Sequence, residues 1–373
     1  MRHERLKVAV TGASGFIGRN LVLSLTERGY DVKPITRDTS LAEAERAIIA
    51  ADTIFHLAGV NRPSDESEFR FNADHAAWLA GLVAQSEHGP LLIFSSSIKA
   101  AEDTPYGKSK RAAEGILLEL GTMGKATVSI WRLPNVYGKW SRPNYNSVVA
   151  TFCHNIARGL PLQIDDPAAA LSLLYVDDLI DQWLWLIDIP PRTSGFAEPQ
   201  GTDLTSVGEL AELLRQFFDL RLEGEVHDVA TGFKRRLFAS FMSALPIEQT
   251  ACPLTPRIDP RGSFVEILKT GASGQFSYFT AHPGVTRGGH YHHSKVEKFV
   301  VAGGTARFRF RHAVSGETFE IVSDASHPAL IETLPGWAHD VTNVGDNELI
   351  VFSWASEKFD PKRPDTHAMP LSR

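Results

Sequence analysis

Apolar runs and amphipathic segments alternate along the first third of the chain. Short apolar runs typical of buried strands occupy Leu6–Val10, Val32–Ile35, Thr53–Leu57, Leu91–Phe94 and Val128–Trp131. Between these runs, apolar residues recur with a helical period over Phe16–Arg28, Glu68–Gln85 and Lys108–Leu120. Strands that alternate with helices in this way predict a parallel, doubly wound sheet covered by helices. We therefore expect an α/β domain at the start of the chain.

The pattern changes after residue 245. Before that point, residues 147–245 are mixed, with a helix expected over Ser206–Phe218 behind a Ser206/Glu209 capping box. A linker between two domains is then indicated by four prolines, at positions 246, 253, 256 and 260. Beyond the linker, short strands separated by glycine turns are expected at Phe264–Leu268, Phe276–Thr280, Lys298–Val301, Ala306–Arg311 and Leu349–Ser353. We therefore predict two domains, 1–245 (α/β) and 246–373 (all-β, a sandwich or barrel).

Composition excludes several classes of protein. The formal net charge of −6 and the absence of a Lys/Arg run argue against nucleic acid as a partner. Two cysteines are too few for a disulfide framework. No apolar stretch reaches the length of a membrane span, and the first residues lead into a strand pattern instead of a signal peptide. We expect a cytoplasmic protein with no membrane partner, assembled as a homodimer or a higher homo-oligomer.

Chemistry in the first domain begins at a glycine-rich turn. Thr11-Gly12-Ala-Ser14-Gly15-Phe-Ile-Gly18 follows the first strand and opens the first helix, where glycines let the backbone approach a pyrophosphate. Farther along, Tyr106 and Lys110 lie one helical turn apart and share a face. An ammonium beside a phenol stabilises the phenolate, so we expect Lys110 to lower the pKa of Tyr106 toward neutrality. Tyr106 would then serve as a general acid for a carbonyl that is being reduced.

These residues together resemble the extended short-chain dehydrogenase/reductase family. The resemblance covers about residues 1–245 and includes His56-Leu57-Ala58-Gly59, Phe94–Ser97, Tyr106–Lys110 and Arg132-Leu-Pro-Asn135-Val-Tyr-Gly138. It implies Ser97, Tyr106 and Lys110 as the catalytic trio, with Ser96 as the alternative hydroxyl, and a substrate contact from Asn135 and Arg132. The implied cofactor contacts are Gly12, Ser14, Gly15, Phe16, Ile17, Gly18, Arg37, Leu57, Ala58, Tyr106 and Lys110.

The choice of cofactor rests on the end of the second strand. Family members that prefer NAD carry an acid there, which accepts the ribose hydroxyls. This chain has Arg37 near that position, and a cation suits a 2′-phosphate. We therefore expect NADPH. In the alternative, Arg37 is a solvated loop residue and Asp38 takes the ribose.

Histidines gather in the second domain. His290 and His292 stand two apart on an expected strand and point to one face, while Glu297 and His339 follow in later strands. Such a set suits a first-row divalent metal, and zinc is the ion that we expect. The spacing resembles the two cupin motifs. A surface hairpin rich in histidine is the simpler alternative, and His293 would replace His292 only if a bulge altered the alternation.

A second resemblance of this domain is to the nucleotide-sugar 3,5-epimerases, through Asp259-Pro-Arg261-Gly262 and Arg287-Gly-Gly-His290-Tyr. In that family the histidine matching His290 is the base that removes a proton beside a ketone. His290 is therefore expected as a base and also as a metal ligand, and these two roles compete. Arg261 and Arg287 are expected to contact the substrate.

Over its full length, the chain resembles bifunctional enzymes of capsular polysaccharide and lipopolysaccharide synthesis. That resemblance implies an α/β Rossmann domain followed by an all-β cupin jelly roll. It also implies C3 epimerisation of UDP-2-acetamido-2,6-dideoxy-L-arabino-hexos-4-ulose in the cupin, followed by NADPH-dependent C4 reduction. The product would be UDP-N-acetyl-6-deoxy-L-talosamine, on the way to N-acetyl-L-fucosamine. The alternatives are a nucleotide-sugar 4-epimerase or 4-reductase with a non-catalytic cupin, and a non-catalytic NADP-sensing regulator.

Overall fold

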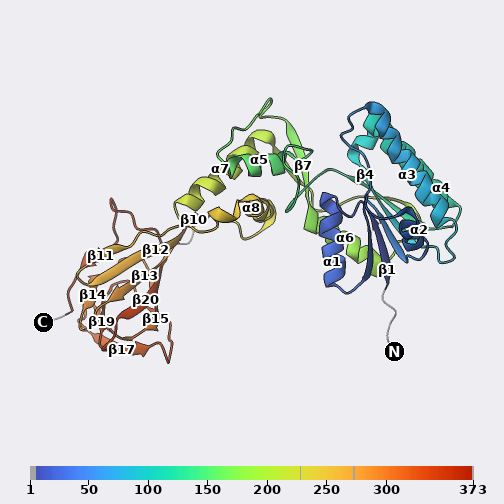
Figure 1. Ribbon diagram of the computed structural model, residues 1–373. Coiled ribbons are helices and arrows are strands. Elements are labelled where there is room, and N and C mark those ends of the chain that lie inside the picture. Colours follow the sequence, from blue (N-terminus) through green and yellow to red (C-terminus); the bar gives the residue numbers. More distant parts are fainter. Residues whose placement is uncertain (1–5, 227, 272–273, 372–373) are drawn as a thin grey trace, which may run out of the picture. The chain divides into compact units, whose positions relative to one another are not determined.

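The computed structural model describes residues 6–226, 228–271 and 274–371 (Figure 1). By their internal contacts the residues form two compact units, one of 1–214 with 236–245 and the other of 215–235 with 246–373. Segment 215–235 thus groups with the second unit, although the sequence pattern assigns it to the first domain. Its strand β10 (Glu225–Val226) pairs with β12 (Gly262–Thr270) of that unit. The boundary at residue 245 stays a prediction.

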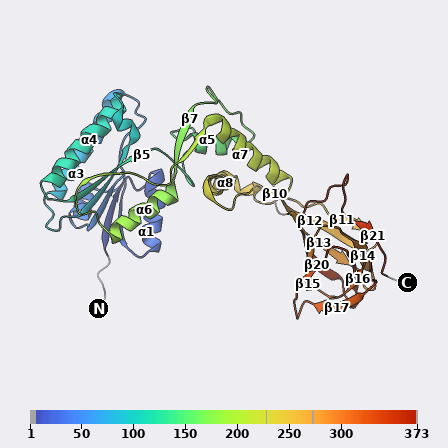
Figure 2. The same ribbon diagram turned by 180° about the vertical axis from the view of Figure 1, so that it is seen from behind.

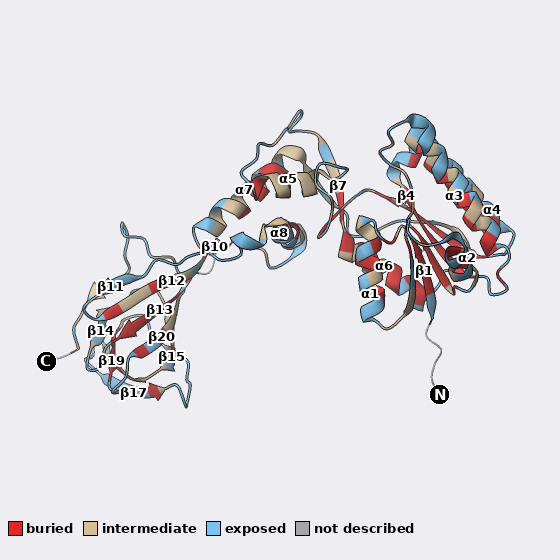
Figure 3. Cartoon of the chain, in the orientation of Figure 1, coloured by how far each residue is buried: buried red, intermediate tan, exposed pale blue. Residues whose placement is uncertain are grey.

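A six-stranded parallel sheet forms the centre of the first unit. Its order is β2 (Asp31–Ile35), β1 (Lys7–Thr11), β3 (Thr53–His56), β4 (Leu91–Ser97), β5 (Thr127–Leu133) and β8 (Gly195–Ala197). Every pairing between neighbours is parallel. The central strands are buried on both faces (Figure 3), which is why they read as continuous apolar runs in the sequence.

Helices cover both faces of this sheet. Val8 and Val10 of β1 face α1 (Phe16–Glu27) and α6 (Val176–Asp188), and they belong to one apolar cluster. Ala9 points to the opposite face and belongs to a second cluster. The helices on that second face are α2 (Leu41–Ile49), α3 (Arg70–Val83) and α4 (Pro105–Thr122). The views in Figures 1 and 2 show α1 beside α6 and α3 beside α4. The predicted doubly wound sheet is confirmed.

The expected elements are present with shifted ends, but several helices, among them α2 and α6, were not predicted individually. Helix α2 was not predicted from the pattern, although Ser40 and Glu43 form a complete capping box at its start. The capping box predicted at Ser206 is present, because Glu209 N donates to Ser206 Oγ at 3.2 Å and Ser206 N donates to the Glu209 carboxylate at 2.9 Å. The helix behind it, α7, spans Val207–Leu222.

A smaller group of elements completes the first unit. A three-stranded sheet orders β6 (Asn135–Tyr137), β7 (Ala170–Tyr175) and β9 (Asp203–Ser206). Helices α5 (Val148–Ile156) and α8 (Gly232–Ala244) accompany it. Short 3₁₀ turns lie at Glu66–Phe69 and Ile98–Ala101, and a third, Ile247–Gln249, belongs to the second unit. Among the described residues, no helix combines the length and the apolar character needed to cross a membrane.

The second unit is built from two sheets whose strand pairs are antiparallel, except for the parallel pair of β10 with β12. One sheet orders β10, β12, β13 (Gly274–Ala281), β20 (Leu349–Ala355), β15 (Glu297–Gly303) and β18 (Ile331–Glu332), with β11 (Arg257–Asp259) beside β12. The other orders β17 (Thr318–Asp324), β16 (Thr305–His312), β19 (Trp337–Asn343), β14 (Thr286–Tyr291) and β21 (His367–Ala368). Apolar side chains from both sheets form one core, including Phe279, Phe299 and Phe308. The prediction of an all-β domain is confirmed.

Candidate functional sites

The glycine-rich turn joins β1 to α1 in a backbone path that only glycine permits. Gly12 has φ +70°, and a Cβ atom on it would lie 2.7 Å from the backbone nitrogen of Ala58. A Cβ on Gly18 would lie 2.3 Å from the Gly12 carbonyl oxygen. Gly15 caps α1, and no acidic side chain occupies the first turn of the helix. Its positive N-terminus is therefore available to an anion such as a pyrophosphate.

The end of β3 lies directly beside this turn. Thr11 Oγ1 bonds to His56 Nδ1 at 2.7 Å and accepts a hydrogen bond from Ala58 N at 3.3 Å. Leu57 and Ala58 thus lie next to the turn of Gly12–Gly18, as expected if both segments line one dinucleotide site. Ser14, Phe16 and Ile17 lie at or just before the start of α1, where each is at least partly exposed.

The three expected catalytic side chains converge at the end of β4. Ser97 is the last residue of β4, and Tyr106 and Lys110 lie in the first turns of α4. A hydrogen bond joins Tyr106 to Ser97. Lys110 Nζ donates to the Ser95 carbonyl oxygen at 2.8 Å and lies 4.7 Å from the centre of the Phe94 ring. This arrangement places a phenol, a hydroxyl and an ammonium in one half-buried corner.

The pKa of the phenol departs from expectation. Burial raises the pKa of Tyr106, and the hydrogen bond from Ser97 only partly opposes that effect. Burial lowers the pKa of Lys110 to about 8, against the opposing charge of Glu114. The prediction that Lys110 lowers the pKa of Tyr106 toward neutrality is therefore wrong for this structure. The ammonium is directed at the Ser95 carbonyl instead of the phenol oxygen.

Glu114 organises the neighbourhood of this corner. The carboxylate is only 2% exposed, and it accepts a hydrogen bond from Ser96 Oγ at 2.5 Å. It also pairs with Arg132 through two bonds, of 2.9 Å from Nε and 2.6 Å from Nη2. Ser96 is thus buried and engaged, which leaves Ser97 as the accessible hydroxyl. The guanidinium of Arg132 is held by Glu114 and lies over the Phe196 ring, and a substrate contact from Arg132 stays a prediction.

We expect Glu114→Gln to lower the free energy of unfolding of the first unit by about 1.5–3 kcal/mol, the usual contribution of hydrogen bonds to a charged group. The reason is that glutamine keeps the shape but leaves Arg132 without its counter-ion. Urea unfolding measures the change. Glu119→Gln on the exposed face of the same helix is the matched control. Equal losses from both variants would contradict this account of Glu114.

The remaining expected contacts of the first unit are exposed. Arg37 and Asp38 both follow β2 as exposed side chains, in a turn where Asp38 N donates to Thr36 Oγ1 at 3.2 Å. Asn135 begins β6 and is also exposed. Their geometry is compatible with ligand contact, and the choice between Arg37 and Asp38 stays a prediction.

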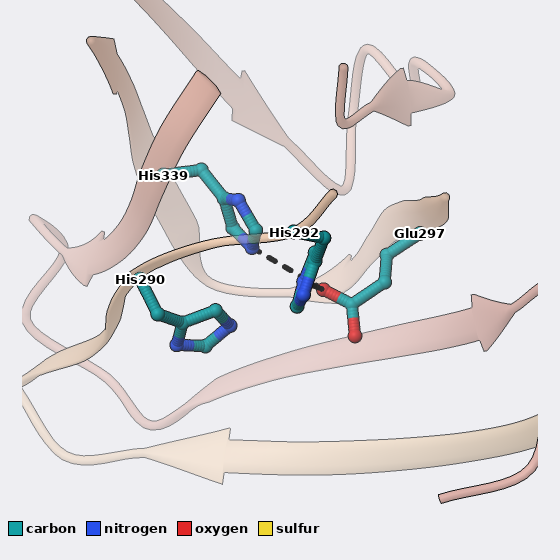
Figure 4. A group of neighbouring side chains, drawn as sticks. All are labelled: His290, His292, Glu297 and His339. Atoms are coloured by element: carbon teal, nitrogen blue, oxygen red, sulfur yellow. Dashed lines mark hydrogen bonds and ion pairs between the residues drawn. The ribbon is translucent and has the colours of Figure 1, made fainter. Parts of the chain in front are cut away.

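In the second unit, four side chains from three strand regions converge as the spacing predicts. His290 lies in β14, His292 just beyond its end, Glu297 at the start of β15 and His339 in β19 (Figure 4). One potential ligand atom from each lies within 4.8 Å of all the others. The structure thus places these histidines in a common cluster instead of on a surface hairpin.

Strand β14 does contain a bulge, but it lies before His290, where the register of β14 against β19 shifts after Gly288. The bulge therefore does not put His293 in the place of His292. His292 is buried inside the cluster, whereas the exposed His293 packs its ring against His367 at 4.5 Å. His292 is therefore the member of this pair that belongs to the cluster.

The hydrogen bonds of the cluster fit a cation between its members. His292 Nδ1 bonds to the Asp365 carbonyl oxygen, which can only accept, so this nitrogen carries the proton. In neutral His292, Nε2 then presents a lone pair to Glu297 Oε2 at 3.1 Å. His339 Nε2 lies 3.2 Å from the same oxygen. Two acceptors that face each other, His292 Nε2 and Glu297 Oε2, require either a proton or a metal ion between them.

Burial and neighbouring groups shift the pKa values of Glu297 and His290 in the cluster. Burial alone would raise the pKa of Glu297, but its contacts with His292 and His339 and the charge of Lys295 hold it well below its ordinary value. Burial lowers the pKa of His290 to about 4, with His339 acting in the same direction. A carboxylate beside the neutral imidazole of His290 suits a divalent metal, which binds deprotonated ligands.

Of the two arginines expected to contact substrate, Arg261 is the more available. Its guanidinium pairs with Asp259 at 2.6 Å, and its side chain is 53% exposed. Arg287 is only 12% exposed, and its Nε donates to the Thr280 carbonyl oxygen at 2.8 Å. Arg287 therefore ties β14 to the neighbouring sheet, and a substrate contact from it stays a prediction.

Sequence reasoning missed Asp365, Lys295 and Glu114. Lys295 Nζ lies 3.3 Å from Glu297 Oε1, and the Asp365 carbonyl orients His292. Glu114 could have been found, because it lies one helical turn after Lys110 on the same face. Asp365 carries no such signal, since it lies in an irregular segment far along the chain from the residues that it contacts.

Comparisons with known proteins match both units. Residues 8–194 match the NAD dependent epimerase/dehydratase family, and residues 257–367 match the polysaccharide biosynthesis C-terminal domain. A UDP-2-acetamido-2,6-beta-L-arabino-hexul-4-ose reductase of Pseudomonas aeruginosa is 48% identical over 97% of this chain and 98% of its own.

Among solved structures, the capsular polysaccharide assembling protein CapF from Staphylococcus aureus superposes with a TM-score of 0.91 and 36% identity, over 98% of this chain and 100% of that one. A UDP-glucuronate 4-epimerase of Arabidopsis thaliana is 24% identical, over only 52% of this chain and 58% of its own. The similarity to the reductase and to CapF therefore extends over both units, whereas the match to the 4-epimerase covers about half of the chain.

Proposed function

Because the chain belongs to the family of nucleotide-sugar enzymes that includes the UDP-2-acetamido-2,6-beta-L-arabino-hexul-4-ose reductase, we propose that it epimerises C3 of UDP-2-acetamido-2,6-dideoxy-L-arabino-hexos-4-ulose and then reduces C4. The product is UDP-N-acetyl-6-deoxy-L-talosamine. The observation that carries this proposal is the 48% identity to that reductase along 97% of the chain. Two separate clusters of reactive side chains, one in each unit, supply the chemistry that it requires.

The first unit carries out the reduction. A bound nicotinamide cofactor supplies the hydride that adds to C4 of the sugar. Ser97 holds the C4 carbonyl oxygen by a hydrogen bond, and Tyr106 gives its phenolic proton to that oxygen as the alcohol forms. Lys110 and the backbone around Ser95 fix the start of α4 against the end of β4. Burial raises the pKa of Tyr106, so the phenol is protonated before hydride transfer, and the strongly basic alkoxide that forms at C4 can take this proton.

The second unit carries out the epimerisation. The ketone at C4 acidifies the proton on C3, so a base can remove it and leave an enolate. Reprotonation from the opposite face then inverts the stereocentre. We assign the base to His290, because burial keeps its imidazole neutral and it is less buried than His292 and His339. Epimerisation must precede reduction, because the alcohol formed by reduction no longer acidifies C3.

We propose that His292, Glu297 and His339 hold a divalent metal, most simply zinc, with His290 beside it. A divalent cation supplies positive charge close to the developing enolate oxygen. Three protein ligands leave a coordination position open, which is the arrangement of catalytic zinc sites. In the alternative, His290 is a fourth ligand and the site is structural.

Metal analysis distinguishes these two arrangements. We expect protein that was never exposed to chelator to carry about one zinc ion per chain, and His290→Asn to retain it. Loss of zinc from His290→Asn alone would make His290 a ligand. Complete absence of metal from the wild-type protein would favour a metal-free epimerase with His290 as its base.

The choice of nicotinamide cofactor is a separate proposal. We infer that NADPH is preferred, with Arg37 at its 2′-phosphate. We expect Arg37→Asp to lower the preference for NADPH over NADH by about 10–100-fold, the equivalent of one hydrogen bond to a charged group. Lys125→Asp is the matched control, because this exposed residue precedes β5, which is separated from β2 by β1, β3 and β4. An unchanged ratio of kcat/KM values in Arg37→Asp would place the 2′-phosphate elsewhere.

Direct assay tests the proposed function as a whole. Wild-type protein with NADPH and the UDP-4-keto sugar is expected to oxidise NADPH, and NMR of the product is expected to show the talo configuration. Oxidation that yields the C3 epimer of this product would mean that the second unit is not an epimerase. No oxidation with any UDP- or dTDP-4-keto sugar would reject the reductase assignment.

A further inference from the structure

The turn that carries His292 is held by residues near the C-terminus. This turn, residues 292–296, joins β14 to β15 and brings His292 and Lys295 next to Glu297. Immediately after β20, the chain contacts this turn through Ser356. Val296 N donates to Ser356 Oγ at 3.0 Å, and Ser356 N donates to the Val296 carbonyl oxygen at 2.9 Å. The segment 356–370, which we call the C-terminal strap, then follows the turn in mostly irregular backbone.

Asp365 of the strap binds three consecutive backbone amides of the turn. Its carboxylate accepts from His293 N at 2.8 Å, Ser294 N at 2.7 Å and Lys295 N at 2.9 Å. The Ser294 hydroxyl adds a fourth hydrogen bond at 3.0 Å. These amide bonds and the Ser294 hydroxyl keep the pKa of Asp365 far below its ordinary value despite burial. The negative charge of the strap thus satisfies donors that the turn itself leaves open.

The backbone of the strap contacts both His292 and the strand that carries His290. The Asp365 carbonyl oxygen accepts from His292 Nδ1, which sets the tautomer that directs Nε2 at Glu297. Two residues later, β21 pairs with β14, and Ala368 lies opposite His290. Met369 N donates to the Gly289 carbonyl oxygen at 2.8 Å. The strap therefore contacts the chain on both sides of the His290–His292 pair.

We propose that the C-terminal strap is part of the metal site, that Asp365 is a positioning residue for His292 and Lys295, and that docking of the strap and metal binding strengthen each other. This inference rests on the proposed metal site in the second unit. Groups that orient metal-binding histidines typically change metal affinity by about 10–100-fold when they are lost. Linkage requires the reverse effect as well, so metal must stabilise the docked strap by the same factor.

The first experiment measures zinc affinity in the full-length protein by competition with a chromogenic chelator. We expect Asp365→Ala to weaken zinc binding by about 10–100-fold, with a smaller loss in Asp365→Asn, which keeps one acceptor oxygen. Asp360→Ala is the matched control, because the bonds of this exposed residue among the described residues stay within the strap, to Lys362 N at 2.9 Å and Arg363 N at 3.1 Å. Equal affinities in wild type and Asp365→Ala would overturn the inference. A wild-type protein that binds no zinc would instead reject the proposed metal.

The second experiment needs no variant of the strap. Trypsin is expected to cleave after the exposed Lys362, and zinc is expected to slow this cleavage in the wild-type protein by about 10–100-fold, as reciprocity requires. In His339→Ala, which removes a ligand but no contact of the strap, zinc should give no protection. If the wild-type protein binds zinc and trypsin cleaves it at the same rate with and without the ion, the strap and the metal are not linked and the proposal fails.

Discussion

Tyr106→Phe is expected to remove nearly all NADPH oxidation while leaving NADPH binding close to that of the wild type. The phenol is the only group at the end of β4 and the start of α4 that we assign as a proton donor to the C4 oxygen. A general acid of this kind contributes roughly 10²–10⁴-fold to the rate. Phenylalanine keeps the ring and its packing against Phe69, so the loss should appear in kcat with little change in cofactor affinity.

Tyr30→Phe is the control for that variant. The Tyr30 hydroxyl bonds to Asp188 at 3.4 Å, next to β2 at its amino end, and it has no part in the proposed chemistry. Stopped-flow absorbance at 340 nm with pre-epimerised substrate measures the hydride step alone. If Tyr106→Phe kept more than about half of the wild-type rate, the proton donor would be another group.

Glu297→Gln is expected to remove both the metal and the epimerisation. Its carboxylate is the one anionic member of the cluster, and Oε2 lies within 3.2 Å of Nε2 of both His292 and His339. An amide oxygen has no net charge to offset that of a divalent ion. We therefore expect zinc to fall below about a tenth of an ion per chain, and C3 proton exchange to fall by at least about 10².

Reduction of a pre-epimerised substrate should be unchanged in Glu297→Gln, because Ser97, Tyr106 and Lys110 lie in the other unit. Glu332→Gln is the control, since this exposed glutamate on β18 pairs with Lys298 outside the cluster. Metal content that is normal in Glu297→Gln would show that the carboxylate is not a ligand.

Local patterns predicted the parts of the fold that depend on local physics. The central strands of the first unit are buried on both faces, so they appear as apolar runs, and Gly12 is required by a positive φ that the turn imposes. The cluster of His290, His292, Glu297 and His339 was also predictable, because alternation along a strand fixes which side chains share a face.

Features that depend on partners distant in sequence were not predictable. Arg132 carries the family motif, yet Glu114 from α4 binds its guanidinium. The pKa of Tyr106 is governed by burial, which the spacing to Lys110 does not reveal. Asp365 contacts His293 across 72 positions of sequence, and no periodic pattern connects them.

The grouping of segment 215–235 with the second unit was also not predictable, because it depends on contacts with residues distant in sequence. The helical period of α7 continues smoothly through residue 214, so nothing in the sequence marks a change of unit there. What separates the two halves is the set of contacts that each makes, including the pairing of Glu225 in β10 with Lys269 of β12.

Deuterium exchange at C3 of the UDP-4-keto sugar, followed by NMR in D₂O without any nicotinamide, tests the division of labour most directly. The account predicts that wild type and Tyr106→Phe exchange C3 at equal rates, because a base beside a ketone needs no hydride donor. His290→Asn should show no exchange above the uncatalysed rate, yet it should still reduce a pre-epimerised substrate. Exchange that persists in His290→Asn and vanishes in Tyr106→Phe would contradict the account, and would place epimerisation in the first unit.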